Sequence, residues 1–294
     1  MIEGALESAI ARDAGSAVLG AHRIAGGDVS HAYRVELADG RSLFVKSHRS
    51  PPPGMYGLEV RGLLWLREAA ALAVPEVVCV SDVAPAYLAL GFIESGSGGG
   101  DFAEQLGRGL AALHGANAQG FGLAYDSYVA VIAQPNRPCD DWPSFYAERR
   151  LEPMLARAVS AGRAPRPLRI AVDRVIDRIR RDPEGACGPA EPPARLHGDL
   201  WSGNVIVDPV GRPCLIDPAV YGGHREVDLA MMRLFGGFSD RCFDAYHEAA
   251  PLAPGHAERV GLYQLYQLYP LLVHVALFGR SYVGRTVELA ARLG

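Results

Sequence analysis

Three oxygen-bearing side chains stand at intervals that suit the transfer of a phosphoryl group. Asn204 follows Asp199 by five residues, and Asp217 comes 13 residues later, after one short predicted hairpin. Phosphoryl transfer needs a carboxylate beside the attacking hydroxyl and metal ligands beside the β- and γ-phosphates. Asp and Asn also favour turns for local reasons, so the prediction rests on all three residues together. We expect Asp199 to be the catalytic base, and Asn204 and Asp217 to bind magnesium.

A lone lysine supports this chemistry. Of the 29 basic residues only Lys46 is a lysine, and it ends the apolar run 43–45, while Glu59 follows 13 residues later on a predicted helix. In kinases a strand lysine held by a helix glutamate contacts the phosphates of ATP. A Walker motif is excluded because Val45, not glycine, precedes Lys46. We expect Lys46 and Glu59 to form this pair, the alternative for Glu59 being an exposed helix charge.

A glycine pair precedes the predicted hairpin. Gly26 and Gly27 would let backbone N–H groups approach an anion closely, and Ser30 could add a hydroxyl donor. We expect this segment to cover the phosphates of the nucleotide. The alternative is a plain turn.

Composition excludes several classes of protein. The chain has 294 residues, of which 49% are hydrophobic and 21% charged, with a net charge of −4. These values are typical of a globular protein and give no electrostatic case for binding nucleic acid. Neither a signal-peptide pattern nor an apolar run long enough for a membrane span occurs. Five cysteines, with no C-x-x-C pair, favour reduced thiols and a cytoplasmic location.

The predicted elements change in character along the chain. Strand-like runs at 31–37 and 41–46 flank the turn 38–40 and form a predicted hairpin. A helix over 56–71 and strand-like runs at 76–80 and 87–93 follow, and beyond them the helical period dominates. The loop 182–193 and a hairpin over 205–207 and 214–216 interrupt the helices. We therefore expect an α+β fold with a small β-rich N-terminal lobe (1–94), a glycine-rich hinge (95–101) and a larger, mainly helical C-terminal lobe (102–294).

Several motifs carry a resemblance that extends over nearly the whole chain. The chain resembles the fructosamine kinase (ketosamine 3-kinase) family, within the aminoglycoside phosphotransferase-like group of kinases. The motifs are His197-Gly198-Asp199-Leu200-Trp201-Ser202-Gly203-Asn204, Ile216-Asp217-Pro218-Ala219-Val220-Tyr221, 223–231, Gln134-Pro135-Asn136, 145–151, 263–266 and 277–279.

The resemblance implies a two-lobed, protein-kinase-like fold and the ATP-dependent phosphorylation of a ketosamine at its C3 hydroxyl. It gives Asp199, Asn204, Asp217, Lys46 and Glu59 the roles expected above, with ATP and Mg²⁺ as cofactors. It also makes the segment of Gly91, Phe92 and Ile93 the hinge that faces the adenine. The sequence departs from the family pattern in its sparser glycine loop, in Gly91, where an acidic residue is common, and in the more apolar stretch 126–133.

The acceptor could be a free ketosamine or a glycated protein. Because its amine is protonated near neutral pH, a carboxylate or an aromatic face should meet it. Trp201, two residues after the expected base, is the candidate ring, the alternative being that it packs the loop. His224, Arg225 and Glu226 either line the acceptor pocket or form an ion-pair cluster.

Other residues of these motifs are expected to be structural. Asp228 is predicted to cap a helix, the alternative being a catalytic role, and His197 is predicted to brace the catalytic loop. Tyr263, Tyr266 and Tyr269 are predicted to pack the C-terminal lobe.

Two rival functions remain open at this point. One is a kinase for an aminoglycoside, choline or another amino alcohol, and the acceptor-lobe sequence after Asp217 favours the ketosamine over it. The other is a pseudokinase acting as a binding module, which degraded catalytic residues would have supported; none of them is degraded.

Overall fold

A five-stranded antiparallel sheet forms the N-terminal part of the computed structural model, which describes residues 2–24, 30–260 and 264–294. The strands run in the order β1-β2-β3-β5-β4. Their bounds are Val18–Ile24 (β1), His31–Leu37 (β2), Ser42–Ser47 (β3), Val77–Ser81 (β4) and Tyr87–Gly91 (β5). The predicted hairpin is confirmed as β2 and β3, whereas β1 was not predicted.

Each face of this sheet is covered by one helix. Side chains alternate along a strand, so Tyr87 and Ala89 of β5 pack with α1 (Gly4–Ala14), whereas Leu88 and Leu90 pack with α2 (Met55–Glu68). Helix α2 ends earlier than predicted. It also reaches the C-terminal part, because its Leu66 belongs to a second apolar cluster there. The helix that carries Glu59 thus contacts both parts of the molecule.

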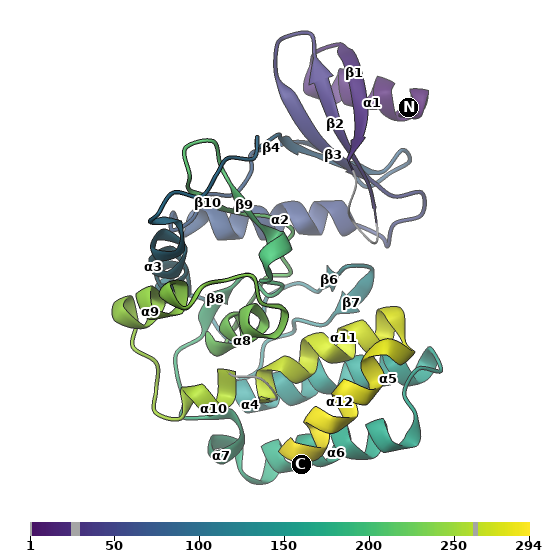
Figure 1. Ribbon diagram of the computed structural model, residues 1–294. Coiled ribbons are helices and arrows are strands. Elements are labelled where there is room, and N and C mark those ends of the chain that lie inside the picture. The colour runs from purple at the N-terminus through teal and green to yellow at the C-terminus, as the bar shows by residue number, and fades with distance from the viewer. Residues whose placement is uncertain (1, 25–29, 261–263) are drawn as a thin grey trace.

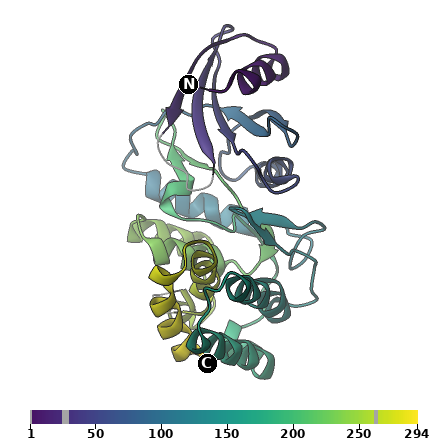
Figure 2. The same ribbon diagram turned by 90° about the vertical axis from the view of Figure 1, so that its right-hand side faces the viewer.

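The C-terminal part is mainly helical, as the sequence predicts, and lies below the sheet in Figures 1 and 2. A π-helical turn, Tyr146–Leu151, joins α4 to α5. Helix α7 lies in the segment 182–193, for which the sequence predicts a loop. The helices are α3 (Phe102–Gly115), α4 (Trp142–Phe145), α5 (Glu152–Ser160), α6 (Arg166–Arg181), α7 (Pro183–Cys187), α8 (Glu226–Phe235), α9 (Asp240–Ala249), α10 (His256–Val260), α11 (Leu268–Phe278) and α12 (Arg280–Leu293).

In the part of the chain that the structure describes, three short antiparallel strand pairs lie between the sheet and the helices. Strands β9 (Val205–Val207) and β10 (Pro213–Leu215) form the predicted hairpin, and β8 (Ala194–Leu196) pairs with β11 (Tyr221–Gly223). Strands β6 (Ser127–Val129) and β7 (Ile132–Gln134) form a hairpin that the sequence does not predict. The Tyr128 hydroxyl on β6 donates to the carbonyl of Pro53, 3.1 Å away. This last hairpin therefore contacts the N-terminal part.

The connector between the two parts is fixed by one close approach. Gly96 donates its N–H to the carbonyl of Val207 at 2.9 Å. A Cβ atom at this position would lie 2.1 Å from the carbonyl oxygen of Asp208. Only glycine fits where the connector passes the β9–β10 hairpin.

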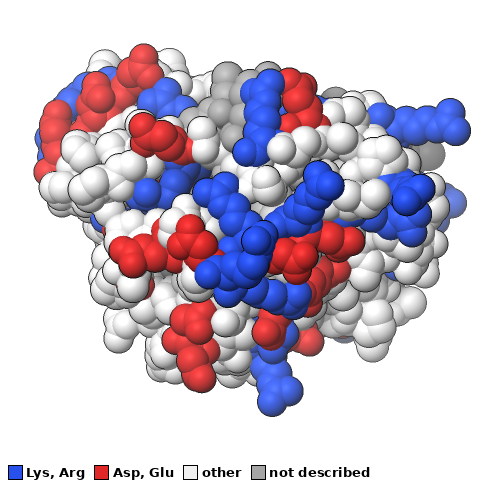
Figure 3. Space-filling model, turned by 90° about the horizontal axis from the view of Figure 1, so that it is seen from below, with Lys and Arg blue, Asp and Glu red and all other residues white. Residues whose placement is uncertain are grey.

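Charges of both signs are mixed on the helical end of the molecule. Figure 3 shows this face from below, with basic side chains in the middle and acidic ones beside them. Among the described residues, no helix is both long enough and apolar enough to cross a membrane.

Candidate active site

The structure brings Asp199, Asn204 and Asp217 together. The Asn204 side-chain amide donates to the Asp199 backbone carbonyl at 2.8 Å and to its carboxylate at 3.1 Å, and lies 3.5 Å from the carbonyl of Asp217. Asn204 is buried, at 5% exposure. Burial and the negative charge of Asp217 raise the pKa of Asp199 to about 7, against the opposing hydrogen bond from Asn204. A carboxylate with a pKa near neutrality is suited to accept a proton from a hydroxyl.

Asp228 holds the loop that carries Asp199. Its two carboxylate oxygens accept the backbone N–H groups of His197 (2.8 Å) and Gly198 (2.9 Å), and His114 Nε2 lies 3.2 Å away. Burial alone would raise the pKa of Asp228, but its bonds to His114 and to the loop lower it. The prediction that Asp228 caps a helix is therefore wrong: the residue lies inside α8 and braces a distant loop.

His197 has the structural role that the sequence predicts. Its Nε2 lies 2.9 Å from the carbonyl of Ile216, and its Nδ1 accepts the N–H of Asp199 at 3.3 Å. Burial lowers the pKa of His197, which favours the neutral ring. The imidazole thus connects the loop of Asp199 to the strand end before Asp217.

Two backbone conformations shape this loop. Gly198 has a φ of 81°, and a Cβ there would lie 2.1 Å from the carbonyl oxygen of Ala219. Asp217 has a φ of 52°, a left-handed conformation that Asp adopts at a cost of roughly 1–2 kcal/mol. This cost is tolerated where the surrounding contacts fix the residue.

Lys46 joins the sheet to the catalytic loop. Its ammonium lies 2.8 Å from Asp217 Oδ1 and forms an ion pair with Glu59. Lys46 is buried, at 9% exposure. Burial alone would lower its pKa, but the two carboxylates outweigh this effect and hold the pKa above its usual range. The predicted strand lysine and helix glutamate are therefore paired in space.

The donor set suits a magnesium ion. Asp217 offers carboxylate oxygens on a side chain that is 45% exposed, and the amide nitrogen of Asn204 points to Asp199, which leaves its oxygen as a ligand. Mg²⁺ prefers one or two such protein oxygens together with phosphate and water oxygens. Asn204 and Asp217 are therefore the residues that would hold such an ion.

The expected nucleotide-binding residues are described in part. Gly26 and Gly27 lie outside the described residues. The Ser30 hydroxyl lies 3.4 Å from the hydroxyl of Tyr56 on α2. Gly91 ends β5, and its N–H donates to Glu76 (2.8 Å), while that of Phe92 donates to Ser42 (3.0 Å). A contact of adenine with the segment 91–93 must therefore use groups other than these two N–H groups.

A narrow hollow opens beside Asp199, and most of its wall is apolar. Its wall is supplied by the β6–β7 hairpin, α8 and α11. No sequence signal combines these residues, and the prediction for Tyr269 is only that it packs the C-terminal lobe. The lining residues are Val129, Gly198, Asp199, Val227, Met231, Tyr269, Pro270, Val273 and His274.

A buried polar cluster supports the hollow from behind. The Tyr269 hydroxyl donates to Gln134 Oε1 at 2.8 Å, and Gln134 Nε2 donates to the carbonyl of Ala219 at 3.1 Å. Arg150 is fully buried and donates to Asn136 Oδ1 at 2.8 Å, with its guanidinium 3.7 Å from the ring centre of Tyr221. These bonds fix the β6–β7 hairpin against the segment that follows Asp217.

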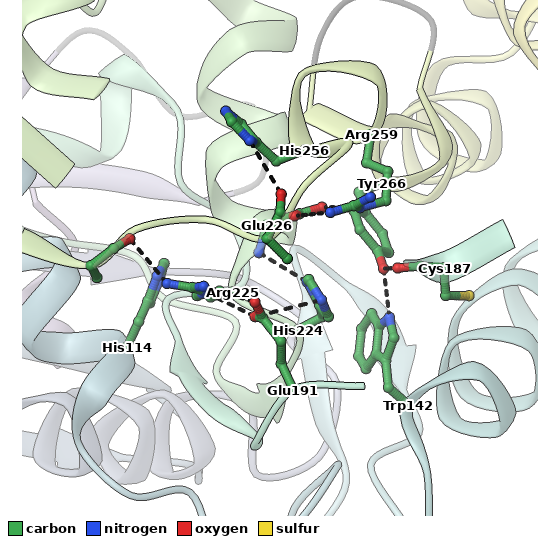
Figure 4. Close-up of polar contacts among 12 residues, drawn as sticks. His114, Trp142, Cys187, Glu191, His224, Arg225, Glu226, His256, Arg259 and Tyr266 are labelled. Atoms are coloured by element: carbon green, nitrogen blue, oxygen red, sulfur yellow. Dashed lines mark hydrogen bonds and ion pairs between the residues drawn. The ribbon is translucent and has the colours of Figure 1, made fainter. Parts of the chain in front are cut away.

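His224, Arg225 and Glu226 lie in an ion-pair cluster and do not line the hollow. Arg225 forms a two-bond ion pair with Glu191 at 2.7 and 2.8 Å, and Glu226 forms one with Arg259 at 2.8 Å (Figure 4). His224 is buried and stacks on Tyr266, with 5.3 Å between ring centres. Burial lowers the pKa of His224 to about 4. The structure thus favours the second of the two alternatives for these residues.

Trp201 lies at the surface beside the catalytic loop. Its side chain is 41% exposed, and a Cβ at Gly203 would lie 2.2 Å from the indole. The glycine therefore lets the ring fold over the loop. Trp201 also meets Phe235 edge to face at 6.5 Å.

Comparison with solved structures assigns the fold. A crystal structure from Thermobifida fusca that carries the name fructosamine-3-kinase superposes with a TM-score of 0.87, at 39% identity over 98% of both chains. A macrolide 2′-phosphotransferase from Brachybacterium faecium superposes with a TM-score of 0.63 at 17% identity, over 99% of this chain and 98% of that one. The second match is evidence of fold alone. The fold is the protein-kinase-like α+β fold that the sequence predicts.

Comparison with known sequences assigns the family. A protein from Enterococcus faecium named "Probable ketoamine kinase" is 37% identical over 90% of this chain and 92% of its own length. The chloroplastic protein-ribulosamine 3-kinase of Arabidopsis thaliana is 33% identical over 88% of this chain and 78% of its own. The sequence profile of the fructosamine kinase family matches residues 5–293. The chain therefore belongs to the fructosamine kinase family.

Proposed function

We propose that this protein transfers the γ-phosphoryl group of ATP to the C3 hydroxyl of a ketosamine, with Mg²⁺ as the metal. One observation carries the proposal: hydrogen bonds link Lys46, Asp199, Asn204 and Asp217, and Asp199 lines a hollow that a hydroxyl could enter. The relatives named ketoamine kinase and ribulosamine 3-kinase support this acceptor class.

In the proposed reaction the charged and polar side chains of the site have separate roles. Asn204 holds one carboxylate oxygen of Asp199, which leaves the other oxygen to accept the proton of the acceptor hydroxyl. Lys46 is protonated and would lie beside the α- and β-phosphates, with Glu59 fixing its position. When bound, Mg²⁺ would neutralise part of the negative charge of the phosphates, and Asn204 and Asp217 are the residues that would hold it.

We further propose that residues 1–94 bind the nucleotide through Lys46, Glu59, Gly26, Gly27, Ser30 and the segment 91–93. In this proposal residues 95–101 form the hinge, and residues 102–294 bind the acceptor. The five cysteines are free, which supports a cytoplasmic location. The acceptor would be a small ketosamine or a glycated side chain on a protein.

The decisive experiment is ATP consumption by the purified protein across a panel of ketosamines, aminoglycosides and choline. We expect turnover with ketosamines only, identified by a product phosphorylated at C3. Turnover with an aminoglycoside or with choline would replace the proposed acceptor. No turnover with any acceptor, together with intact ATP binding, would favour a binding module.

Lys46→Arg should lower kcat/KM by at least about tenfold, or about 1.4 kcal/mol. Arginine keeps the charge, but its planar fork cannot replace a point charge between Glu59, Asp217 and the phosphates. Steady-state kinetics give the effect, and circular dichroism checks that the fold is intact. Unchanged kinetics would mean that the lone lysine has no special role.

Trp201→Leu should raise KM for the ketosamine by roughly two- to thirtyfold, which corresponds to the loss of one cation–π contact. KM for ATP should change much less, because the proposed contact of the ring is with the ammonium group of the acceptor. The melting temperature should change little, since the side chain is 41% exposed. A large drop in melting temperature, or equal effects on both substrates, would assign Trp201 to packing.

A further inference from the structure

An aromatic strip runs along the surface from the hollow beside Asp199. Its centre is His274. The distances from the centre of its ring to the ring centres of Phe235, Phe278 and Tyr282 are 5.0, 5.6 and 4.7 Å. Phe235 in turn meets Trp201. The aromatic strip thus consists of Trp201, Phe235, His274, Phe278 and Tyr282.

Helical spacing connects this strip to the hollow. On α8, Met231 lines the hollow and Phe235 follows four residues later. On α11, His274 lines the hollow and Phe278 follows four residues later. Residues four apart lie on the same face of a helix. The strip therefore begins at the wall of the hollow and continues one turn further along both helices.

The strip ends in exposed rings. Phe278 is 46% exposed and Trp201 is 41% exposed. Exposed aromatic side chains that adjoin a pocket mark a surface for an apolar or cationic group. Aromatic ring faces carry negative charge density, so they attract an ammonium group and disfavour a carboxylate.

We propose that the aromatic strip receives the amine substituent of the acceptor and makes the enzyme prefer ketosamines of apolar or aromatic amines. This inference rests on the proposed function. With the C3 hydroxyl beside Asp199, the ammonium and its substituent leave the hollow along His274 toward Phe278. A substituent that carries a carboxylate gains no binding free energy on the aromatic strip, because the ring faces carry negative charge density.

The test compares two ketosamines that share the sugar that the acceptor panel selects. One carries benzylamine and the other carries glycine, and the readout is the ratio of their kcat/KM values. We expect the wild-type protein to favour the benzylamine compound and Phe278→Ala to lower the ratio by about five- to tenfold. Phe278→Trp should restore the ratio because it keeps an aromatic face.

Ile170→Ala is the matched control, because Ile170 is an apolar residue of similar exposure (41%) on α6. It should leave the ratio unchanged, and melting temperatures verify that all variants fold. An equal ratio in the wild type and in Phe278→Ala would overturn the inference while leaving the proposed function in place. Lack of turnover of any ketosamine by the wild type would instead overturn the proposed function.

Discussion

Asp199→Asn should lower the turnover of a ketosamine by roughly 10²–10⁴-fold. An amide cannot accept the proton that the C3 hydroxyl loses, so the variant lacks the proposed base. Asn204 and Asp217 keep their oxygens, and Lys46 keeps its partners. Binding of Mg-ATP should therefore survive, with a dissociation constant within a few-fold of the wild-type value.

Single-turnover measurements and calorimetric titration with Mg-ATP separate these two effects. Ser202→Ala is a useful control, because Ser202 lies in the same loop and is not among the residues that line the hollow. It should retain most of the activity. Loss of nucleotide binding in Asp199→Asn would mean that this carboxylate belongs to the metal site.

Asp217→Asn should impair both the binding of Mg-ATP and the turnover of the ketosamine. It removes the proposed negative ligand of a hard cation that prefers anionic oxygens, so affinity for Mg-ATP should fall by at least about tenfold. It also removes one of the two carboxylates that hold Lys46. Turnover should decrease by more than the loss of binding accounts for, because the phosphates and Lys46 are no longer aligned.

Titration with ATP in the presence of a chelator of Mg²⁺ gives the metal-independent affinity with which the affinity of this variant for Mg-ATP is compared. Without Mg²⁺ the wild type and Asp217→Asn should bind ATP with similar affinity, whereas with Mg²⁺ they should differ. A difference that persists in the chelator would show that Asp217 acts through Lys46 rather than through the metal. Equal effects of Asp199→Asn and Asp217→Asn on binding would contradict the separate roles proposed for them.

The residues of two turns were sufficient to predict the hairpins that position Lys46, Asn204 and Asp217. The turn at 38–40 specifies the β2–β3 hairpin, and therefore the position of Lys46 at the end of a strand. The turn after Val207 specifies the hairpin that separates Asn204 from Asp217. Both hairpins depend on turn chemistry that a few adjacent residues encode.

Long-range contacts were not predictable in the same way. Asp228 lies near the start of a helix, where a carboxylate usually caps the free N–H groups. Its backbone partners, however, are the N–H groups of residues 31 and 30 positions earlier. The β6–β7 hairpin has only three residues in each strand, and its contacts with Pro53 and Ala219 come from distant segments. Nothing local to either segment encodes such partners, because tertiary packing selects them.

The near-complete use of arginine has a consequence for the protein's own exposure to sugars. Reducing sugars form ketosamines on amines, and a sugar carbonyl needs an accessible, unprotonated nitrogen. The one lysine among 29 basic side chains is 9% exposed and paired with two carboxylates, which keep its amine protonated. The described structure thus offers a reducing sugar no exposed, unprotonated lysine amine on which a ketosamine could form.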